Sequence, residues 1–229
     1  MIESVRVVGA GRVGSAVTAR LAERGLAMPG AGAGREADLV LLCVPDRAIA
    51  DVARELPVGP WVAHVSGATP LSALDPHERR FSVHPLQTFT RARGPEQLDG
   101  AFAAVTGESR EAVAAGRWLA ETLGLEPFEL DDDQRAVYHA GASVASNFLV
   151  TLHAAASELL EAAGAPPEAL APLMARTVEN GFQLTGPIQR GDWETVEAHL
   201  AAIRARRPQL EPLYRCLADA TQTLAGVRA

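Results

Sequence analysis

Short apolar runs alternate with amphipathic segments in the first part of the chain. Residues 4–8 form an apolar run, and beyond a glycine-rich turn Val13, Val17 and Leu21 recur at four-residue spacing, which predicts a strand followed by a helix. The continuous apolar run at residues 37–46 is typical of a strand covered on both faces, and residues 46–56 show an amphipathic helical pattern, with Asp46 as its expected N-cap.

Three further apolar runs continue the alternation. Residues 61–68, 79–86 and 101–107 have strand-like composition, and each ends at Gly, Pro or a polar turn. Residues 109–124 predict a helix with Ser109 as N-cap and Gly124 at its C-terminal end. Strands that alternate with helices indicate an α/β fold with a parallel sheet and crossover helices.

The pattern changes at about residue 131, where Ala, Leu and Glu begin to dominate and strand signals stop. Helices are expected near residues 132–164, 167–183, 192–205 and 208–226, with breaks at Gly and Pro clusters. We therefore predict two domains, an α/β domain at residues 1–130 and an all-helical domain at residues 131–229.

One segment without any charge could be mistaken for a membrane helix. Residues 136–157 carry two His, one Asn, three Ser, one Thr and one Tyr, which are too many polar groups for a lipid-facing span. We interpret it as a buried helix in the middle of the helical domain, and we expect no membrane partner.

Composition excludes several classes of chemistry. The chain has 229 residues and a net charge of −7 without basic runs, which argues against a nucleic-acid partner. All 21 of its cationic side chains are Arg, so mechanisms that need a lysine are excluded. Cys43 and Cys216 are expected to be reduced thiols, and residue 1 leads directly into a strand pattern, so a cytoplasmic location is expected.

The first turn, GAGRVG, has the G-x-G-x-x-G spacing between a strand and a helix. Gly9 would make the tight turn, Gly11 would let a pyrophosphate approach the backbone, and Gly14 would let the helix pack on the strand; the alternative is a glycine turn used only for packing. Later strand ends should face the same crevice. The residues expected to contact a dinucleotide cofactor are Gly9, Ala10, Gly11, Arg12, Val13, Gly14, Val44, Pro45 and Ser66.

Two candidate substrate contacts come from loops. His84 precedes a proline at a strand exit, which restricts its backbone and could hold the imidazole over a substrate or against a loop carbonyl. Arg190 lies in the turn-rich segment 185–192, before the expected N-cap Asp192. It could grip a substrate carboxylate or pin the loop through a salt bridge.

The uncharged helix carries a polar stripe. On a continuous helix His139, Ser143, Ser146, Asn147 and His153 fall within an arc of roughly 120°, so they would form a buried network or line a polar cavity. His139 and His153 would lie about 21 Å apart and could not serve one reacting atom. We predict His139 as the catalytic residue, with Ser143 and Asn147 beside it, and His153 as a core or dimer contact.

The motifs GAGRVG, CVPD, VSGA, HPLQTF, YHAGASVASN and TGPIQRGD occur in that order along the chain. Together they resemble the Rossmann-like oxidoreductases whose C-terminal helical half is called domain of unknown function 2520. More distantly the chain is similar to ketopantoate reductases, pyrroline-carboxylate reductases and hydroxyacid dehydrogenases, and HPLQTF is similar to the His-Pro motif of prephenate dehydrogenases.

The resemblance implies NAD(P) binding and hydride transfer to or from a small keto, hydroxy or imine substrate, without a metal ion. In the hydroxyacid dehydrogenases a lysine and an asparagine lie on the comparable helix, so His139 would act as the acid or base here. Helical halves of this type also imply a homodimer. Two alternatives stay open: a nucleotide-binding or scaffold protein with little or no catalysis, and a prephenate or arogenate dehydrogenase relative.

Residues 26–37 are too few for the expected second strand and its crossover helix. In a dinucleotide fold that strand ends at the adenosine ribose, so the second strand is expected to be missing and that side of the site truncated. Arg35 could meet a 2′-phosphate, and NADP is placed ahead of NAD as the expected cofactor.

Overall fold

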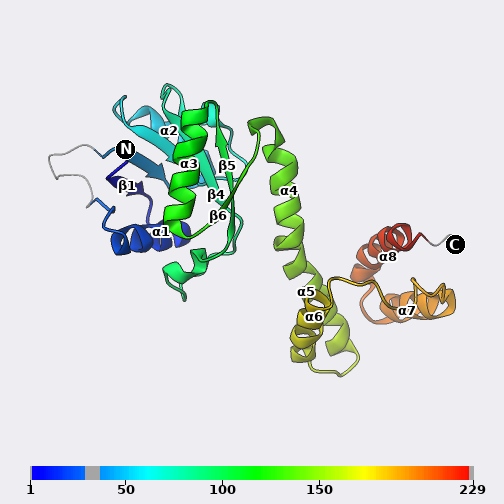
Figure 1. Ribbon diagram of the computed structural model, residues 1–229. Coiled ribbons are helices and arrows are strands. Elements are labelled where there is room, and N and C mark those ends of the chain that lie inside the picture. Colours follow the sequence, from blue (N-terminus) through cyan, green and yellow to red (C-terminus); the bar gives the residue numbers. More distant parts are fainter. Residues whose placement is uncertain (1, 29–36, 227–229) are drawn as a thin grey trace. The chain divides into compact units, whose positions relative to one another are not determined.

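The computed structural model describes residues 2–28 and 37–226, which form two compact units, Met1–Val144 and Ala145–Ala229. The first unit is built on a six-stranded sheet in the order β1 to β6 (Figure 1). Its strands are β1 (Val5–Val8), β2 (Leu39–Leu42), β3 (Trp61–His64), β4 (Arg80–Pro85), β5 (Phe102–Gly107) and β6 (Glu126–Glu129).

Most of the sheet is parallel, as the sequence predicts, with one exception. β4 and β5 pair antiparallel, with His84 opposite Ala104, while the other neighbouring strands run parallel. The reversal arises because a 3₁₀ turn, η2 (Pro95–Leu98), stands between β4 and β5 in place of a crossover helix. β6 was not predicted, because its sequence EPFE offers only two apolar residues.

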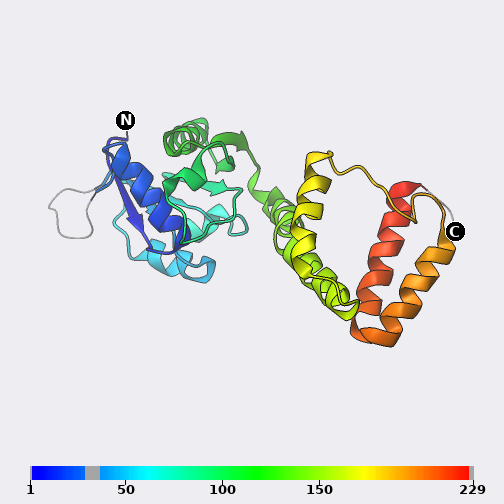
Figure 2. The ribbon, with the colours of Figure 1, turned by 90° about the horizontal axis from the view of Figure 1, so that it is seen from below.

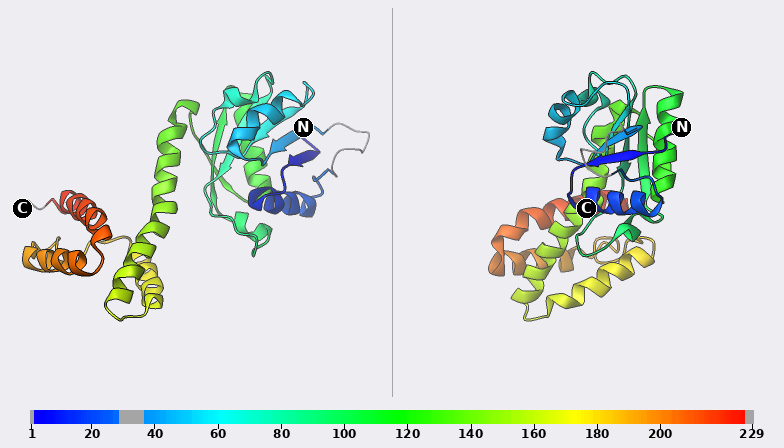
Figure 3. Two further views of the ribbon diagram at one scale, coloured as in Figure 1. Left: turned by 180° about the vertical axis from the view of Figure 1, so that it is seen from behind. Right: turned by 90° about the vertical axis from the view of Figure 1, so that its left-hand side faces the viewer.

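Each face of the sheet is covered by different helices. The helices of this unit are α1 (Arg12–Glu23), α2 (Asp46–Arg54), α3 (Arg110–Leu123) and α4 (Arg135–Ala145), with 3₁₀ turns η1 (Leu71–Leu74) and η3 (Asp132–Gln134). Leu39 and Leu41 point into a core with α1 and α3, whereas Val40 and Leu42 point into a core with α2 and η1. Figure 3 (right) shows the strands between cyan α2 and green α3.

The chain between α1 and β2 has no strand among its described residues. Ala27 makes one isolated parallel bridge to Val5 on the edge of β1 that β2 leaves open. Among the described residues of this connection, the bridge is the one pairing found where the sequence analysis expects the second strand to be missing. Arg35 lies outside the described residues.

The second unit contains α5 (Asn147–Ala162), α6 (Leu170–Glu179), α7 (Trp193–Arg206) and α8 (Glu211–Ala225), with short 3₁₀ turns η4 (Pro167–Ala169) and η5 (Pro208–Leu210). Figure 2 shows α7 and α8 side by side, joined at η5. None of the helices in the described ranges is long and apolar enough to span a membrane.

The uncharged segment differs from the expectation in two ways. It is interrupted at Ser146, which separates α4 from α5, so the predicted single helix is wrong. The predicted burial is also wrong: no residue of α5 is buried, and Phe148 is 57% exposed. Within one chain, the small helical unit has too few partners to cover this apolar surface. The sequence places α4 in the helical half, whereas the compact units divide after Val144.

Candidate functional site

The turn between β1 and α1 is closed at two glycines and open at the third. Gly9 has φ +113°, and a Cβ there would lie 2.4 Å from the Cys43 carbonyl oxygen. A Cβ on Gly14 would lie 2.0 Å from the Gly9 carbonyl oxygen, so both positions exclude a side chain. At Gly11, the N-cap of α1, a Cβ would meet nothing within 4 Å. The open backbone at the helix start fits a pyrophosphate.

The end of β2 lies against this turn. The Cys43 amide donates to the Val8 carbonyl at 2.7 Å, and Pro45 is the N-cap of α2. The helix thus begins at Asp46, one residue beyond the cap, and the predicted capping by the Asp46 side chain is wrong. Burial raises the pKa of the Cys43 thiol to about 12, so this cysteine stays protonated at neutral pH.

Ser66, expected to contact a cofactor, is buried and organises the turn after β3. Its hydroxyl accepts from the amides of Ala68 at 3.2 Å and Thr69 at 3.0 Å, and bonds the Thr69 hydroxyl at 2.9 Å. This is a side-chain-stabilised turn. Gly67, in the same turn, is the residue next to the side chains of His84 and His139.

Gly67 faces two histidines that lie far apart in the sequence. A Cβ on Gly67 would lie 2.8 Å from Cε1 of His84 and 2.9 Å from Cδ2 of His139. The two imidazole centroids are 6.1 Å apart. The structure therefore brings together His84 of β4 and His139 of α4, which the sequence singled out separately.

Tyr138, a residue not predicted for the site, completes the cluster. Its hydroxyl lies 2.7 Å from Nδ1 of His84, and its ring packs edge-on against Phe128 of β6. Burial raises the pKa of Tyr138 to about 12, so the phenol keeps its proton and can donate it to Nδ1. With the phenol as the donor, the hydrogen of neutral His84 is on Nε2, beside Gly67.

The environment keeps His84 neutral. Burial, followed by the neighbouring His139 and Arg135, lowers the pKa of His84 to about 4, while Asp46 acts weakly in the opposite direction. His84 is thus an uncharged hydrogen-bonding group at neutral pH. It suits orienting a polar substrate atom rather than carrying charge.

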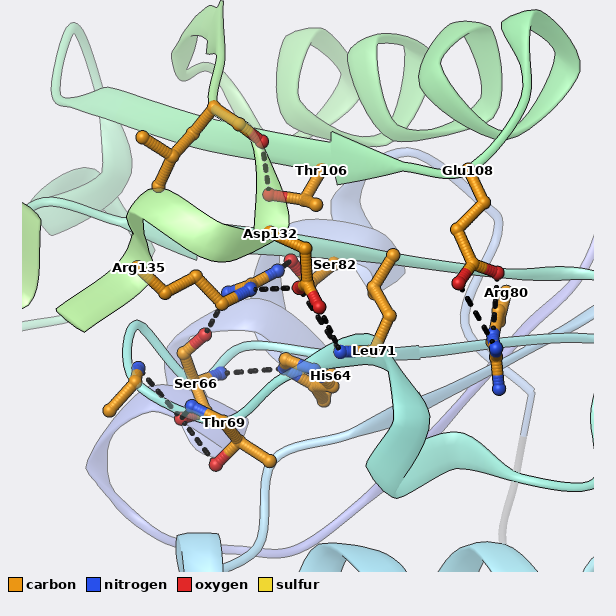
Figure 4. Close-up of polar contacts among 12 residues, drawn as sticks. His64, Ser66, Thr69, Leu71, Arg80, Ser82, Thr106, Glu108, Asp132 and Arg135 are labelled. Carbon is orange, nitrogen blue, oxygen red and sulfur yellow. Dashed lines mark hydrogen bonds and ion pairs between the residues drawn. The ribbon is translucent and has the colours of Figure 1, made fainter.

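A buried arginine fixes the start of α4, as Figure 4 shows. Arg135, 2% exposed, donates to Asp132 at 2.6 Å, to the Ser66 carbonyl at 3.1 Å and to the Ser82 hydroxyl. Asp132 in turn accepts from the Leu71 amide at 3.1 Å. The sequence did not single out these residues, because DDDQR looks like an ordinary solvated run of charges.

His64 lies beneath this network and is inaccessible. Its Nδ1 accepts from the Ser66 amide at 3.2 Å, and burial together with Arg135 lowers its pKa to about 3. It supports the turn as a neutral core residue. No signal in WVAHVSGA distinguishes it from a reactive histidine.

The remaining predicted residues do not join this cluster within the first unit. Ser143 lies one turn after His139 on α4 and is half-buried. Asn147 begins α5, beyond the break at Ser146, so the predicted arc through a continuous helix does not form. Arg190 lies exposed in the segment before α7, where Asp192 caps the helix as predicted. Asn147 and Arg190 both belong to the second unit.

Among residues 2–28 and 37–226, no group of three or more His, Cys, Asp or Glu side chains has an arrangement that could hold a metal ion. The groups described at this edge of the sheet are two imidazoles, a phenol and the backbone of the glycine turn.

Comparison with known proteins gives a family and a fold. The model of the family described as Domain of unknown function (DUF2520) matches residues 101–221. No curated protein matches the sequence. A Thermotoga maritima protein is 24% identical, with a TM-score of 0.79 over 97% of this chain and 98% of that chain.

Two enzymes have the same fold at lower identity. A reductive aminase from Aspergillus terreus, solved with NADPH and ethyl-5-oxohexanoate, is 15% identical with a TM-score of 0.67, over 100% of this chain and 97% of that chain. A 1-pyrroline-5-carboxylate reductase from Streptococcus pyogenes is 16% identical with a TM-score of 0.60, over 97% of both chains. At these identities the similarity shows the fold alone.

Gly67→Ala tests the packing of the histidine pair. The new methyl group would overlap both imidazoles, so we expect a loss of about 1–3 kcal/mol in the free energy of unfolding, together with shifted ring signals of His84 and His139. Urea unfolding and histidine NMR measure these effects. Gly141→Ala, in open space on α4, is the matched control. Equal stability and unchanged ring signals in both variants would refute the proposed geometry.

Proposed function

The chain belongs to the family described as Domain of unknown function (DUF2520), and we propose that it is an NAD(P)-dependent oxidoreductase. The proposed substrate is a small keto, hydroxy or imine compound. One observation carries the proposal: the glycine turn and the histidine pair lie at the same edge of the sheet. β1 to β4 are parallel, so their carboxyl ends lie at one edge of the sheet. The glycine turn follows β1, Gly67 follows β3, and His84 is near the end of β4 at that edge.

The glycine turn fits the pyrophosphate of a nicotinamide dinucleotide. Gly11 leaves the backbone open at the start of α1, where the free N–H groups and the helix dipole attract phosphates. Arg12, the first residue of α1, adds a positive charge there. A nicotinamide cofactor supplies the hydride in such a site.

The protein's own contribution is the proton and the orientation. We assign His139 as the acid or base that exchanges a proton with the substrate oxygen or nitrogen. His84, held neutral and hydrogen-bonded to Tyr138, would orient the same atom through Nε2. Ser143, on the same face of α4 one turn later, would bind another polar group of the substrate.

A second function is favoured by the short connection between α1 and β2. In dinucleotide folds the second strand carries the adenosine-ribose contacts, and here Ala27 alone bridges to β1 among the described residues. A nucleotide-binding protein with little or no catalysis would tolerate this loss. It would bind a nucleotide at the turn without turnover.

A cofactor-binding experiment distinguishes the proposed dinucleotide site from a glycine turn that serves only for packing. We expect millimolar NADPH, and NADH more weakly, to raise the melting temperature, because a ligand present at 100 times its Kd stabilises by about 2.7 kcal/mol. Gly11→Val should keep the fold, since open space surrounds Gly11, with a slightly lower melting temperature because Val is a poorer N-cap than Gly. It should lose the NADPH shift. A wild-type protein that neither cofactor stabilises would contradict cofactor binding.

We also propose that the helical unit forms a homodimer. Its large apolar side chains are exposed in one chain, including Phe148 (57%) and Val150 (70%) of α5 and Leu224 (77%) of α8. Large exposed apolar surfaces mark interaction sites in soluble proteins. A second copy of the same helices would cover them.

Phe148→Glu combined with Val150→Glu tests the dimer. Two buried carboxylates should weaken the association strongly, so sedimentation should show a shift from dimer to monomer. Val58→Glu changes an equally exposed valine of the first unit and should leave the dimer intact. A wild-type chain that sediments as a monomer at tens of micromolar would exclude this assembly.

A further inference from the structure

Three arginines line one cavity beside α1. Arg12, Arg91 and Arg93 surround a volume of about 270 Å³, with Ser15 on the helix and Thr90 and Gly94 on the opposite wall. No acidic side chain is among its lining residues. The cavity thus offers guanidinium, hydroxyl and backbone groups without a carboxylate.

Arg91 and Arg93 lie in a loop whose backbone is hydrogen-bonded to the buried side-chain amide of Gln97. Gln97 is 2% exposed, and its Nε2 donates to the carbonyls of Thr90, Arg93 and Gly94 at 3.2, 2.8 and 3.0 Å. Its Oε1 accepts from the Thr90 amide at 2.8 Å. These bonds fix the backbone on both sides of Arg91 and Arg93. The two arginines therefore project from an ordered support.

A second buried side chain holds this loop against α1. Arg20, 6% exposed, donates to the Pro95 carbonyl at 3.1 Å, to Asp99 at 2.7 Å and to the Leu123 carbonyl of α3 at 2.8 Å. Figures 1 and 3 show the η2 segment lying beside α1. Both walls of the cavity are therefore tied to the same core.

The three positive charges are poorly neutralised within the described residues. Arg12 and Arg91 make no ion pair within the described ranges, and Arg93 has only a 3.9 Å contact to Glu96. Neighbouring cations repel one another, and a bound anion removes the repulsion. The guanidinium fork matches the oxygens of phosphate, and Arg12 stands at the positive end of α1.

The cavity is separate from the side of α1 where the second strand of a dinucleotide fold would contact the adenosine ribose. Ala27 marks that side, on the free edge of β1. The arginine loop is bonded through Arg20 to the end of α3, on the flank of α1 that faces α3. A ligand in this cavity would therefore bind without contacts from the position of the second strand.

We propose that this cavity binds a phosphate group through Arg12, Arg91 and Arg93. The phosphate could come from the dinucleotide at the neighbouring turn or from a separate phosphorylated small molecule. The binding of a phosphate group does not depend on hydride transfer.

Calorimetric titration of the full chain with inorganic pyrophosphate and inorganic phosphate tests the site. We expect the wild type to bind pyrophosphate, and Arg91→Gln with Arg93→Gln to weaken it about ten-fold or more, since two charge-assisted contacts are lost. Arg110→Gln, which removes an exposed cation at the start of α3, should have no such effect. Circular dichroism confirms that each variant is folded.

A parallel titration with NADPH separates the two sources. A matching loss of NADPH affinity in the double variant indicates a cofactor phosphate, and unchanged NADPH affinity indicates a separate phosphorylated ligand. The site is refuted when millimolar pyrophosphate and phosphate both fail to bind, when the double variant binds pyrophosphate as tightly as the wild type, or when Arg110→Gln weakens binding as much as the double variant. Retained NADPH binding in that case leaves the proposed oxidoreductase function standing.

Discussion

The candidate site depends on the burial of one guanidinium. Removing a charged group from water costs several kcal/mol unless hydrogen bonds replace the lost solvent. Arg135 meets this requirement only where Asp132, the Ser82 hydroxyl and the Ser66 carbonyl converge, at the carboxyl ends of β3 and β4. That constraint sets where α4 begins, and it brings His139 within reach of His84 one turn later.

The glycine turn and the histidine pair, at the same edge of the sheet, use glycine in different ways. At the glycine turn, Gly9 and Gly14 have no space for a side chain, and the backbone at Gly11 is open. At the histidine pair, Gly67 makes room for two imidazoles, and Tyr138 and burial set the charge of one of them. Backbone amides suit a phosphate, whereas imidazoles suit proton exchange.

Sequence patterns predicted the secondary-structure elements better than the tertiary contacts between them. The apolar runs predicted β1 to β5. The caps were also predicted, because capping is local: Ser109 and Asp192 stand at the starts of α3 and α7, and Gly124 stands at the end of α3. β6 and the antiparallel β5 depend on tertiary pairing. The helix break at Ser146 and the exposure of α5 were mispredicted, because an uncharged segment looks continuous and buried. Tyr138 and Arg135 gave no local signal, since their roles arise from contacts distant in sequence.

Turnover by the His139→Ala variant tests the central claim most directly. Wild type and variant are compared for NADPH oxidation with a panel of small 2-keto acids and cyclic imines, with His153→Ala as the control from the same uncharged segment. A general acid or base contributes about 10²–10⁴-fold, so we predict a loss of that order in kcat for His139→Ala and none for His153→Ala. Wild-type turnover by His139→Ala would contradict the account.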